Sequence, residues 1–131
     1  MDVSSGLELA FVKDIGVYSL GLSAGSITWE YDLRITDLGI TISPSEEVTD
    51  AFSSVQERAW NRKTASVSFE EVRRIRIKKA RINPDWHFLT VSMKYWWKRS
   101  PIGKLVLRDS HYFPVTKALE SIPELKGKLR D

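Results

Sequence analysis

The chain has 131 residues and a mass of 15.0 kDa, which suits one globular domain and excludes two well-filled cores. Hydrophobic residues make up 42% and charged residues 28% of the sequence, a composition typical of a folded protein and unlike that of a disordered one. There is no cysteine, which excludes disulfides, thiolate nucleophiles and cysteine-based metal or iron–sulfur sites.

The net charge of +3 is unevenly distributed along the chain. Residues 1–61 hold ten acidic and three basic side chains, residues 62–108 hold three acidic and thirteen basic ones, and residues 109–131 hold four of each. This asymmetry predicts either a basic face with an anionic partner or two halves of a sheet that neutralise each other in the folded state. The sequence alone leaves both readings open.

No targeting or membrane-spanning segment is recognisable in the sequence. The chain begins Met1-Asp2, whereas a secretory signal places basic residues before an apolar core. The longest uncharged stretch, 15–29, has fifteen residues with glycine and serine throughout, and a spanning helix needs ~20 mostly apolar residues. We therefore expect a cytoplasmic protein without a transmembrane segment.

The clearest structural signal is a strict alternation of apolar and polar residues over 27–36. A period of two places the large apolar side chains on one face of a strand. Turn residues follow at 37–39, and Ile40-Thr41-Ile42 resumes the alternation, which predicts a β-hairpin. Upstream, 7–12 and 15–22 are weaker strand candidates separated by Lys13-Asp14.

A helix is predicted over about 44–59. Ser43 is followed by Pro44 and, three residues on, by Glu46, which is the pattern of a capping box. Apolar residues then recur at helical spacing, namely Val48, Phe52, Val55 and Ala59. The segment 60–65 is typical of a loop.

From Ser66 onward the pattern predicts strands again. Segments at 67–69, 72–77, 88–95 and 105–107, each with apolar residues at strand-like spacing, are followed by turn sequences at 83–85 and 100–103. Near the C-terminus, Pro114 opens a stretch with apolar residues at helical spacing and Pro123 ends it. Leu125 and Leu129 would extend the same apolar stripe through a second short turn.

This order of elements resembles the PH-like superfold, in particular its small bacterial and archaeal domains. The resemblance rests on the hairpin at 33–42, on the strand, acidic turn and strand at 67–77, and on 105–107 followed by the C-terminal helix. It implies a single α+β domain over 1–131, with a PH-like core at about 26–123. That core would be a mainly antiparallel curled sheet or half-open barrel, capped by the C-terminal helix and interrupted by the inserted helix near 44–59. Family members that bind phosphoinositides carry clustered basic residues at the first hairpin loop, but here the loop 36–39 is acidic, so that site is not carried over.

Nothing in the sequence predicts a catalytic site. The two histidines, His87 and His111, lie far apart and lack the spacing of a metal-binding pair. The run Asp109-Ser110-His111 has the residue types of a nucleophile relay, but adjacent side chains in an extended segment point to opposite faces. We expect a protein that is not an enzyme and that uses no metal and no cofactor.

The run 74–78 predicts a basic strand face. Its cations alternate with isoleucines, so that they share one side of the strand at a spacing of ~6.6–7 Å. The cations of this stripe are Arg74, Arg76 and Lys78, with Lys79 and Arg81 extending it past the strand end. A phosphate polyanion could follow such a stripe, or the stripe could pair across strands with Glu30 and Asp32.

The run 94–99, Lys-Tyr-Trp-Trp-Lys-Arg, is the second binding candidate. Aromatic rings flanked by cations at a strand end suit base stacking, cation–π contacts or a membrane interface. Alternation from Leu89 predicts that Trp97 continues the core-facing side and that Trp96 points the other way, so one indole is buried and the other exposed. The candidate contact residues are Lys94, Trp96, Trp97, Lys98 and Arg99.

These features favour a non-enzymatic PH-like module that binds a protein partner or, peripherally, an anionic membrane surface. The alternative is a small nucleic-acid-binding protein that uses the same basic and aromatic surface. A third hypothesis is a homo-oligomer in which sheet edges or the stripe of Leu125 and Leu129 pair between copies.

Overall fold

The structure is a computed structural model that describes residues 5–19, 26–45, 64–95 and 97–130. Residues 46–59 of the helix expected over about 44–59, most of the loop 60–65 and Trp96 lie outside the described residues. The described part contains eight strands, one α-helix and two short 3-10 helices. The elements are β1 (Glu8–Ser19), β2 (Ser26–Thr36), β3 (Gly39–Pro44), β4 (Ala65–Ser68), η2 (Phe69–Glu71), β5 (Val72–Lys79), β6 (Trp86–Met93), β7 (Lys104–Arg108), α3 (Asp109–Glu120), η3 (Pro123–Leu125) and β8 (Leu129–Arg130). The expected start of the helix over 44–59 is wrong, because Ser43 and Pro44 belong to strand β3 and pair with β2.

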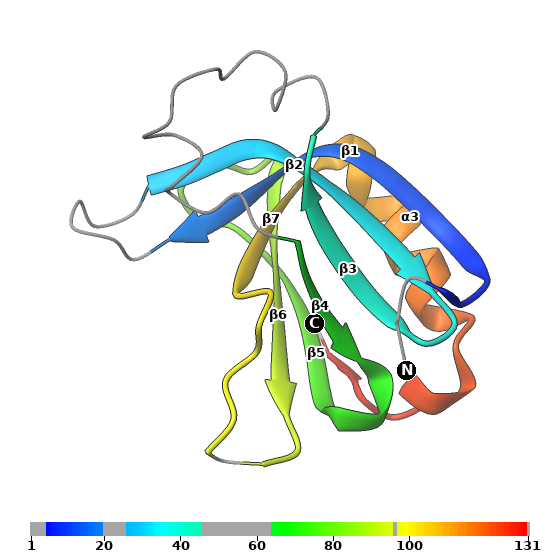
Figure 1. Cartoon of the computed structure of the whole chain (residues 1–131). Coiled ribbons are helices and arrows are strands. Elements are labelled where there is room, and N and C mark those ends of the chain that lie inside the picture. Colours follow the sequence, from blue (N-terminus) through cyan, green and yellow to red (C-terminus); the bar gives the residue numbers. More distant parts are fainter. Residues whose placement is uncertain (1–4, 20–25, 46–63, 96, 131) are drawn as a thin grey trace, which may run out of the picture.

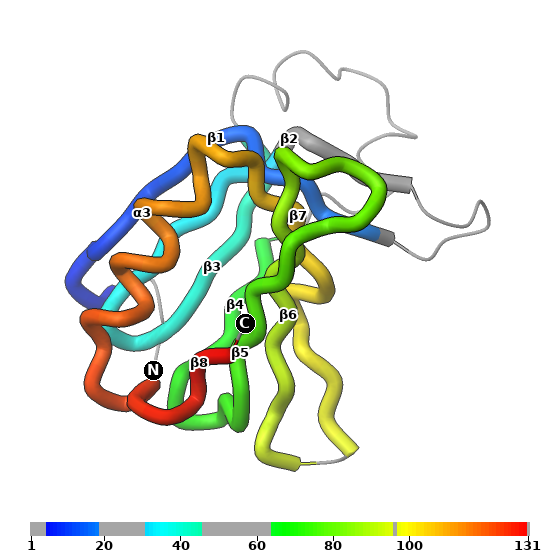
Figure 2. The backbone as a smooth tube through the Cα atoms, turned by 180° about the vertical axis from the view of Figure 1, so that it is seen from behind, coloured from blue at the N-terminus to red at the C-terminus, as the bar shows by residue number. Residues whose placement is uncertain are grey.

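All eight strands belong to one sheet in the order β4-β3-β2-β1-β7-β6-β5-β8. Neighbouring strands are antiparallel except for β5 and β8, which are parallel. The sheet curls without closing, and α3 packs against its inner face (Figures 1 and 2). The expected α+β architecture, a curled sheet with a C-terminal helix, is confirmed at this level.

The core lies between the inner face of the sheet and α3. On the helix, Val115, Ala118 and Leu119 are buried, as the spacing of the apolar residues predicts. On the sheet, the alternating residues of β2 behave as expected, because Tyr31, Leu33 and Ile35 are buried. No helix among the described residues is long and apolar enough to cross a membrane.

The predicted hairpin is confirmed as β2 and β3. Leu33 lies opposite Ile42 and Ile35 opposite Ile40. The Thr36 hydroxyl accepts hydrogen bonds from the backbone N–H groups of Leu38 and Gly39, at 3.2 and 3.3 Å, and so holds the tight turn.

The two weaker strand candidates upstream are one strand, β1, with an irregularity at Lys13-Asp14. The pairing with β2 shifts register between Val12 and Ile15, and Asp14 has a φ of 60°. Aspartate tolerates this left-handed conformation better than most residues. The polar pair that the sequence places between two strands is therefore a bulge within one.

The C-terminal helix begins five residues earlier than expected. It starts at Asp109, so Pro114 lies inside the helix. The imidazole Nδ1 of His111 accepts a hydrogen bond from the backbone N–H of Arg108 at 3.1 Å and caps the first turn. The premise that Asp109, Ser110 and His111 form an extended segment is therefore wrong.

The short turn expected after the helix is present as η3 and includes Leu125, but it does not extend to Leu129. Leu125 lies in η3 and is buried in the core, while Leu129 belongs to β8 beside β5. The Ile75 N–H donates to the Lys128 carbonyl at 2.9 Å. Leu125 is thus used within the chain, and a stripe of Leu125 and Leu129 that pairs between copies is wrong.

Candidate functional site

The basic strand predicted from the sequence is β5, and its cations face away from the core. Ile75 is fully buried and Ile77 packs against the core, whereas Arg74, Arg76 and Lys78 are exposed. The register with β6 shifts between Val72 and Arg74, which explains why Val72 and Ile75 both point inward despite their odd spacing. The three cations therefore lie on the outer face of the sheet, opposite α3.

The neighbouring strands add polar and basic groups to the same outer face. Arg74 lies opposite Ser92, Arg76 opposite Thr90 and Lys78 opposite Phe88 across the β5–β6 ladder, and residues directly opposite each other share a face. On the other side of β5, Arg76 pairs with Arg130 of β8. A sequence pattern could not show this last neighbour, because it depends on a parallel contact between distant segments.

Further along this face, a lysine lies over two aromatic rings. The Lys104 Nζ of β7 is 4.4 Å from the ring centroid of Phe88 and 5.3 Å from that of Tyr18. The two rings meet edge to face with centroids 6.5 Å apart. Tyr18 lies opposite Lys104 and Phe88 opposite Val106, so β1, β6 and β7 together build this cluster. The signal missed in the sequence is the alternation over 104–108, which places Lys104 and Arg108 on one face.

We call these residues the basic sheet face: Arg74, Arg76, Lys78, Lys104 and Arg130, together with the rings of Tyr18 and Phe88. Within the described ranges, no ion pair joins any of its five cations to an acidic side chain. Cross-strand pairing of β5 with Glu30 and Asp32 is wrong, because β1, β7 and β6 separate β2 from β5 in the sheet. The charges of Arg74, Arg76 and Lys78 are therefore directed to solvent, whereas Nη1 of Arg130 donates to the Gly127 and Leu129 carbonyls at 2.9 and 3.0 Å.

Two further cations expected near the stripe lie at the far end of β5. Lys79 pairs with His87 and is on the side turned toward α3, so it does not extend the stripe. Arg81 is exposed in the turn that follows. That turn is held by the Asn83 side chain, which accepts a hydrogen bond from the Asp85 N–H at 2.9 Å.

The aromatic run 94–99 lies beyond the end of β6. Trp97 is 66% and Tyr95 47% exposed, and their rings stack at a tilt with centroids 5.0 Å apart. The prediction that Trp97 continues the core-facing alternation is wrong, because β6 ends at Met93 and a turn follows in which the Lys98 N–H donates to the Tyr95 carbonyl. Ile102, which is 1% exposed, supplies the next core contact instead.

The cations of this loop differ in their availability. Lys98 forms an ion pair with Glu71 at 2.6 Å, and the Lys94 N–H donates to the Glu71 carbonyl at 2.8 Å, so η2 anchors the loop. Lys94 and Arg99 are exposed. Arg74 lies opposite Ser92, two residues before Lys94, so the loop adjoins one end of the basic sheet face.

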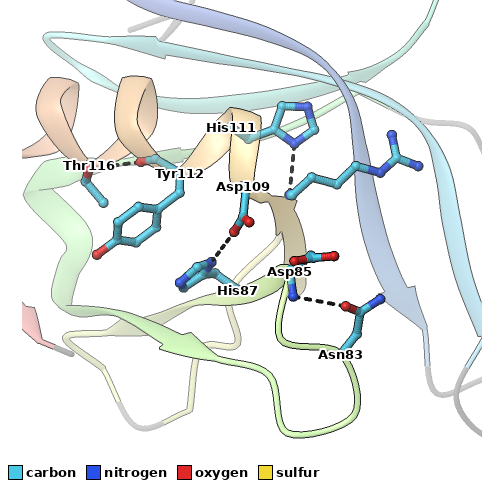
Figure 3. Close-up of polar contacts among 8 residues, drawn as sticks. Asn83, Asp85, His87, Asp109, His111, Tyr112 and Thr116 are labelled. Atoms are coloured by element: carbon cyan, nitrogen blue, oxygen red, sulfur yellow. Dashed lines mark hydrogen bonds and ion pairs between the residues drawn. The ribbon is translucent and has the colours of Figure 1, made fainter.

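The two histidines lie near the start of α3 but serve different contacts (Figure 3). His87 stacks on Tyr112 with ring centroids 4.2 Å apart, and its Nδ1 is 4.0 Å from an Asp109 carboxylate oxygen. His111 points elsewhere, toward the Arg108 backbone. Among the described residues, no group of three or more histidine, aspartate or glutamate side chains could hold a metal ion.

The fold lowers the pKa of His111. Burial is the largest effect and lowers the pKa of His111 from 6.5. The positive charge of Arg108 also lowers this pKa, whereas a hydrogen bond to the Lys13 backbone raises it. Nδ1 of His111 accepts a hydrogen bond from the Arg108 N–H, so the neutral ring carries its proton on Nε2. That Nε2–H donates to the Lys13 carbonyl. His111 therefore ties α3 to the bulge of β1 and has a structural role.

No protein-family model, curated protein or solved structure matches this chain. The basic sheet face and the exposed loop beside it together form the candidate binding surface.

Proposed function

We propose that this protein is a non-enzymatic binding module of the PH-like type that binds an anionic partner through the basic sheet face. The observation that carries the proposal is the placement of five cations from β5, β7 and β8 on one solvent-facing side of the sheet, without acidic partners among the described residues. The like charges of such a surface repel one another, and a bound anion reduces this repulsion.

The strand order supports the PH-like part of the proposal. In the sheet, a meander of four strands, β4-β3-β2-β1, is continued by β7-β6-β5. The helix α3 follows β7 in the sequence. The acidic hairpin loop is not an anion site, because Asp37 accepts a hydrogen bond from the Leu7 N–H at 2.8 Å and is engaged within the fold. The anionic partner is therefore assigned to the outer face of β5, β6 and β7.

An acidic protein surface or an anionic membrane is the first candidate partner. Both present many negative charges at once, as a row of arginines and lysines along a strand requires. The exposed Tyr95 and Trp97 beside the Arg74 end of the face would add an interfacial contact, since aromatic rings favour the boundary between polar and apolar surroundings.

Single-stranded nucleic acid is the second candidate, and the rings of Tyr18 and Phe88 favour it. They share the face with the cations, and Lys104 lies over both rings. A base that stacks on such a ring would bring its phosphate beside Lys104, and the stripe on β5 would hold the following phosphates.

Charge reversal on the face tests the proposal. The variant Arg74→Glu/Arg76→Glu should bind phosphatidylserine-containing vesicles or an oligodeoxythymidylate at least about tenfold more weakly than the unaltered chain at moderate salt, because two charge contacts become repulsive. The matched control is Lys79→Glu/Lys126→Glu, which makes the same change in net charge at exposed positions away from the face. Equal losses in both variants would contradict the proposal. No binding of either probe by the unaltered chain would exclude a membrane and a nucleic acid and leave an acidic protein as the partner.

The two partner classes separate in the same experiment. Binding to the oligonucleotide that falls steeply with salt, and that weakens further in a Phe88→Leu variant, indicates nucleic acid. Binding to vesicles that weakens in a Trp97→Ala variant, with no retention of the oligonucleotide, indicates an anionic membrane.

A further inference from the structure

The first half of β1 has an open edge. Strand β1 pairs with β2 along its length but with β7 only at Gly16, Val17 and Tyr18. From Glu8 to Lys13 the side away from β2 therefore faces no strand. In antiparallel pairing, alternate residues direct their N–H and C=O groups to opposite sides of the strand. In the described part of the chain, none of the groups directed outward from 9–12 has a hydrogen-bond partner.

A groove lies beside this edge. It has a volume of about 440 Å³ and separates β1 from α3. Its walls are mostly apolar and come from Leu9, Ala10 and Phe11 on the strand and from Pro114, Lys117, Ala118 and Ser121 on the helix. An extended segment added to the sheet would need unpaired backbone groups on the strand and apolar side chains around it. The groove offers the first on β1 and the second on both β1 and α3.

Exposed apolar side chains concentrate around the same place. Of the seven large apolar residues that are exposed in the described ranges, four flank this edge: Leu7, Leu9, Phe11 and Phe113. Leu7 is 70% and Phe113 67% exposed. A cluster of this kind on a strand edge marks an interaction surface, because edges that must stay unpaired usually carry charge or are covered.

The other strand edge beside α3 is covered by the chain itself. Residues 129–130 of β8 pair with β5, and the Lys128 carbonyl accepts from the Ile75 N–H. Among the residues that the structure describes, no strand covers the edge of β1 at 8–13, and its end is closed where His111 forms a hydrogen bond with the Lys13 backbone. Of these two edges, that of β5 is covered by β8, whereas that of β1 at 8–13 is open among the described strands.

The charges around the groove favour an acidic occupant. Lys117 lines the groove, and its Nζ is 5.8 Å from the Phe113 ring centroid. Arg34 lies over Phe11 at 5.1 Å and pairs with Glu8 at 2.8 Å, which neutralises the acidic residue nearest the edge. A segment with aspartate or glutamate between its apolar residues would complement Lys117.

We propose that the edge of β1 at 8–13, with the groove beside α3, binds an extended, acidic segment of a partner protein as an added strand. The inference is independent of the basic sheet face, which lies on the outer side of the sheet.

A phage-displayed library of random nine-residue peptides, selected on the full chain, tests the proposal. We expect a consensus in which apolar and acidic residues alternate with a period of two. Synthetic peptides of that consensus should bind at least about tenfold more weakly when the amide nitrogens that face β1 are methylated, because the strand hydrogen bonds are lost. Lys117→Glu should weaken binding about fivefold or more, whereas Lys126→Glu, also exposed but outside the groove, should not.

Three results would overturn the proposal. The first is a consensus with apolar residues at helical spacing or with basic residues. The second is binding that neither methylation nor Lys117→Glu weakens. The third is a dimer in light scattering that Phe11→Ser dissociates, which would assign the edge to a second copy. The variant Arg74→Glu/Arg76→Glu should bind the selected peptides as the unaltered chain does.

Discussion

At the scale of single residues, His111 connects the helix to the first strand through both ring nitrogens. One nitrogen accepts a hydrogen bond from the Arg108 N–H, and the other forms a hydrogen bond with the Lys13 backbone. A proton added to Nδ1 would remove its capacity to accept, and burial already disfavours the charged ring. Protonation should therefore loosen the contact between α3 and β1.

This connection predicts an acid-sensitive stability. Because the pKa of His111 in the folded state is below 6.5, the unfolded chain binds the proton more tightly. The contribution of neutral His111 to the free energy of unfolding is complete above about pH 6.5. This contribution is lost as the pH falls through the lowered pKa that His111 has in the folded state. The free energy of unfolding, measured by urea denaturation between pH 7.5 and 5.5, should fall for the unaltered chain.

The variant His111→Gln tests the assignment. Glutamine does not titrate, so the decline with acid should be smaller in this variant, although its stability at pH 7.5 should be lower. An equal decline in both proteins would show that another group is responsible.

At the scale of elements, α3 stabilises the sheet through one face only. Leu119 is fully buried, whereas Phe113 is 67% exposed on the same helix. Leu119→Ala should lower the free energy of unfolding by about 2–5 kcal/mol, since it leaves a cavity in the core. Phe113→Ala should change it by only about 0.5 kcal/mol. Thermal or urea denaturation of the two variants measures this difference, and similar losses would mean that α3 does not pack as described.

The elements also show what the sequence could and could not predict. The period of two in β2 and β5 identifies the strands and their buried faces, because alternation is a local property of the backbone. The start of α3 was placed at Pro114, since a proline inside a helix is uncommon and the cap supplied by His111 is not a standard capping residue.

The candidate site was predictable in part for the same reason. Arg74, Arg76 and Lys78 share a face by local alternation, and the structure places them there. Trp97 was expected in the core because the end of β6 at Met93 has no strong sequence signal. Arg130 and Tyr18 join the face only through long-range strand pairing, which one sequence does not reveal.

At the scale of the whole molecule, the asymmetry of charge along the chain becomes an asymmetry in space. The acidic strand β2 and the basic strand β5 lie on different parts of the sheet and do not neutralise each other directly. The modest net charge of +3 therefore coexists with one concentrated basic surface. Attraction to an anionic partner through this surface should weaken steeply with salt, because screening acts on exposed charges.

Amide chemical shifts of the labelled chain, recorded by NMR during titration with a short heparin oligosaccharide, test the central claim most directly. The proposed function predicts that the largest changes fall on β5, β6 and β7, at Arg74, Arg76, Lys78, Thr90 and Lys104, and that they fade as salt is raised. Changes confined to the hairpin loop at 36–39, or spread evenly over exposed lysines such as Lys117 and Lys126, would contradict the account.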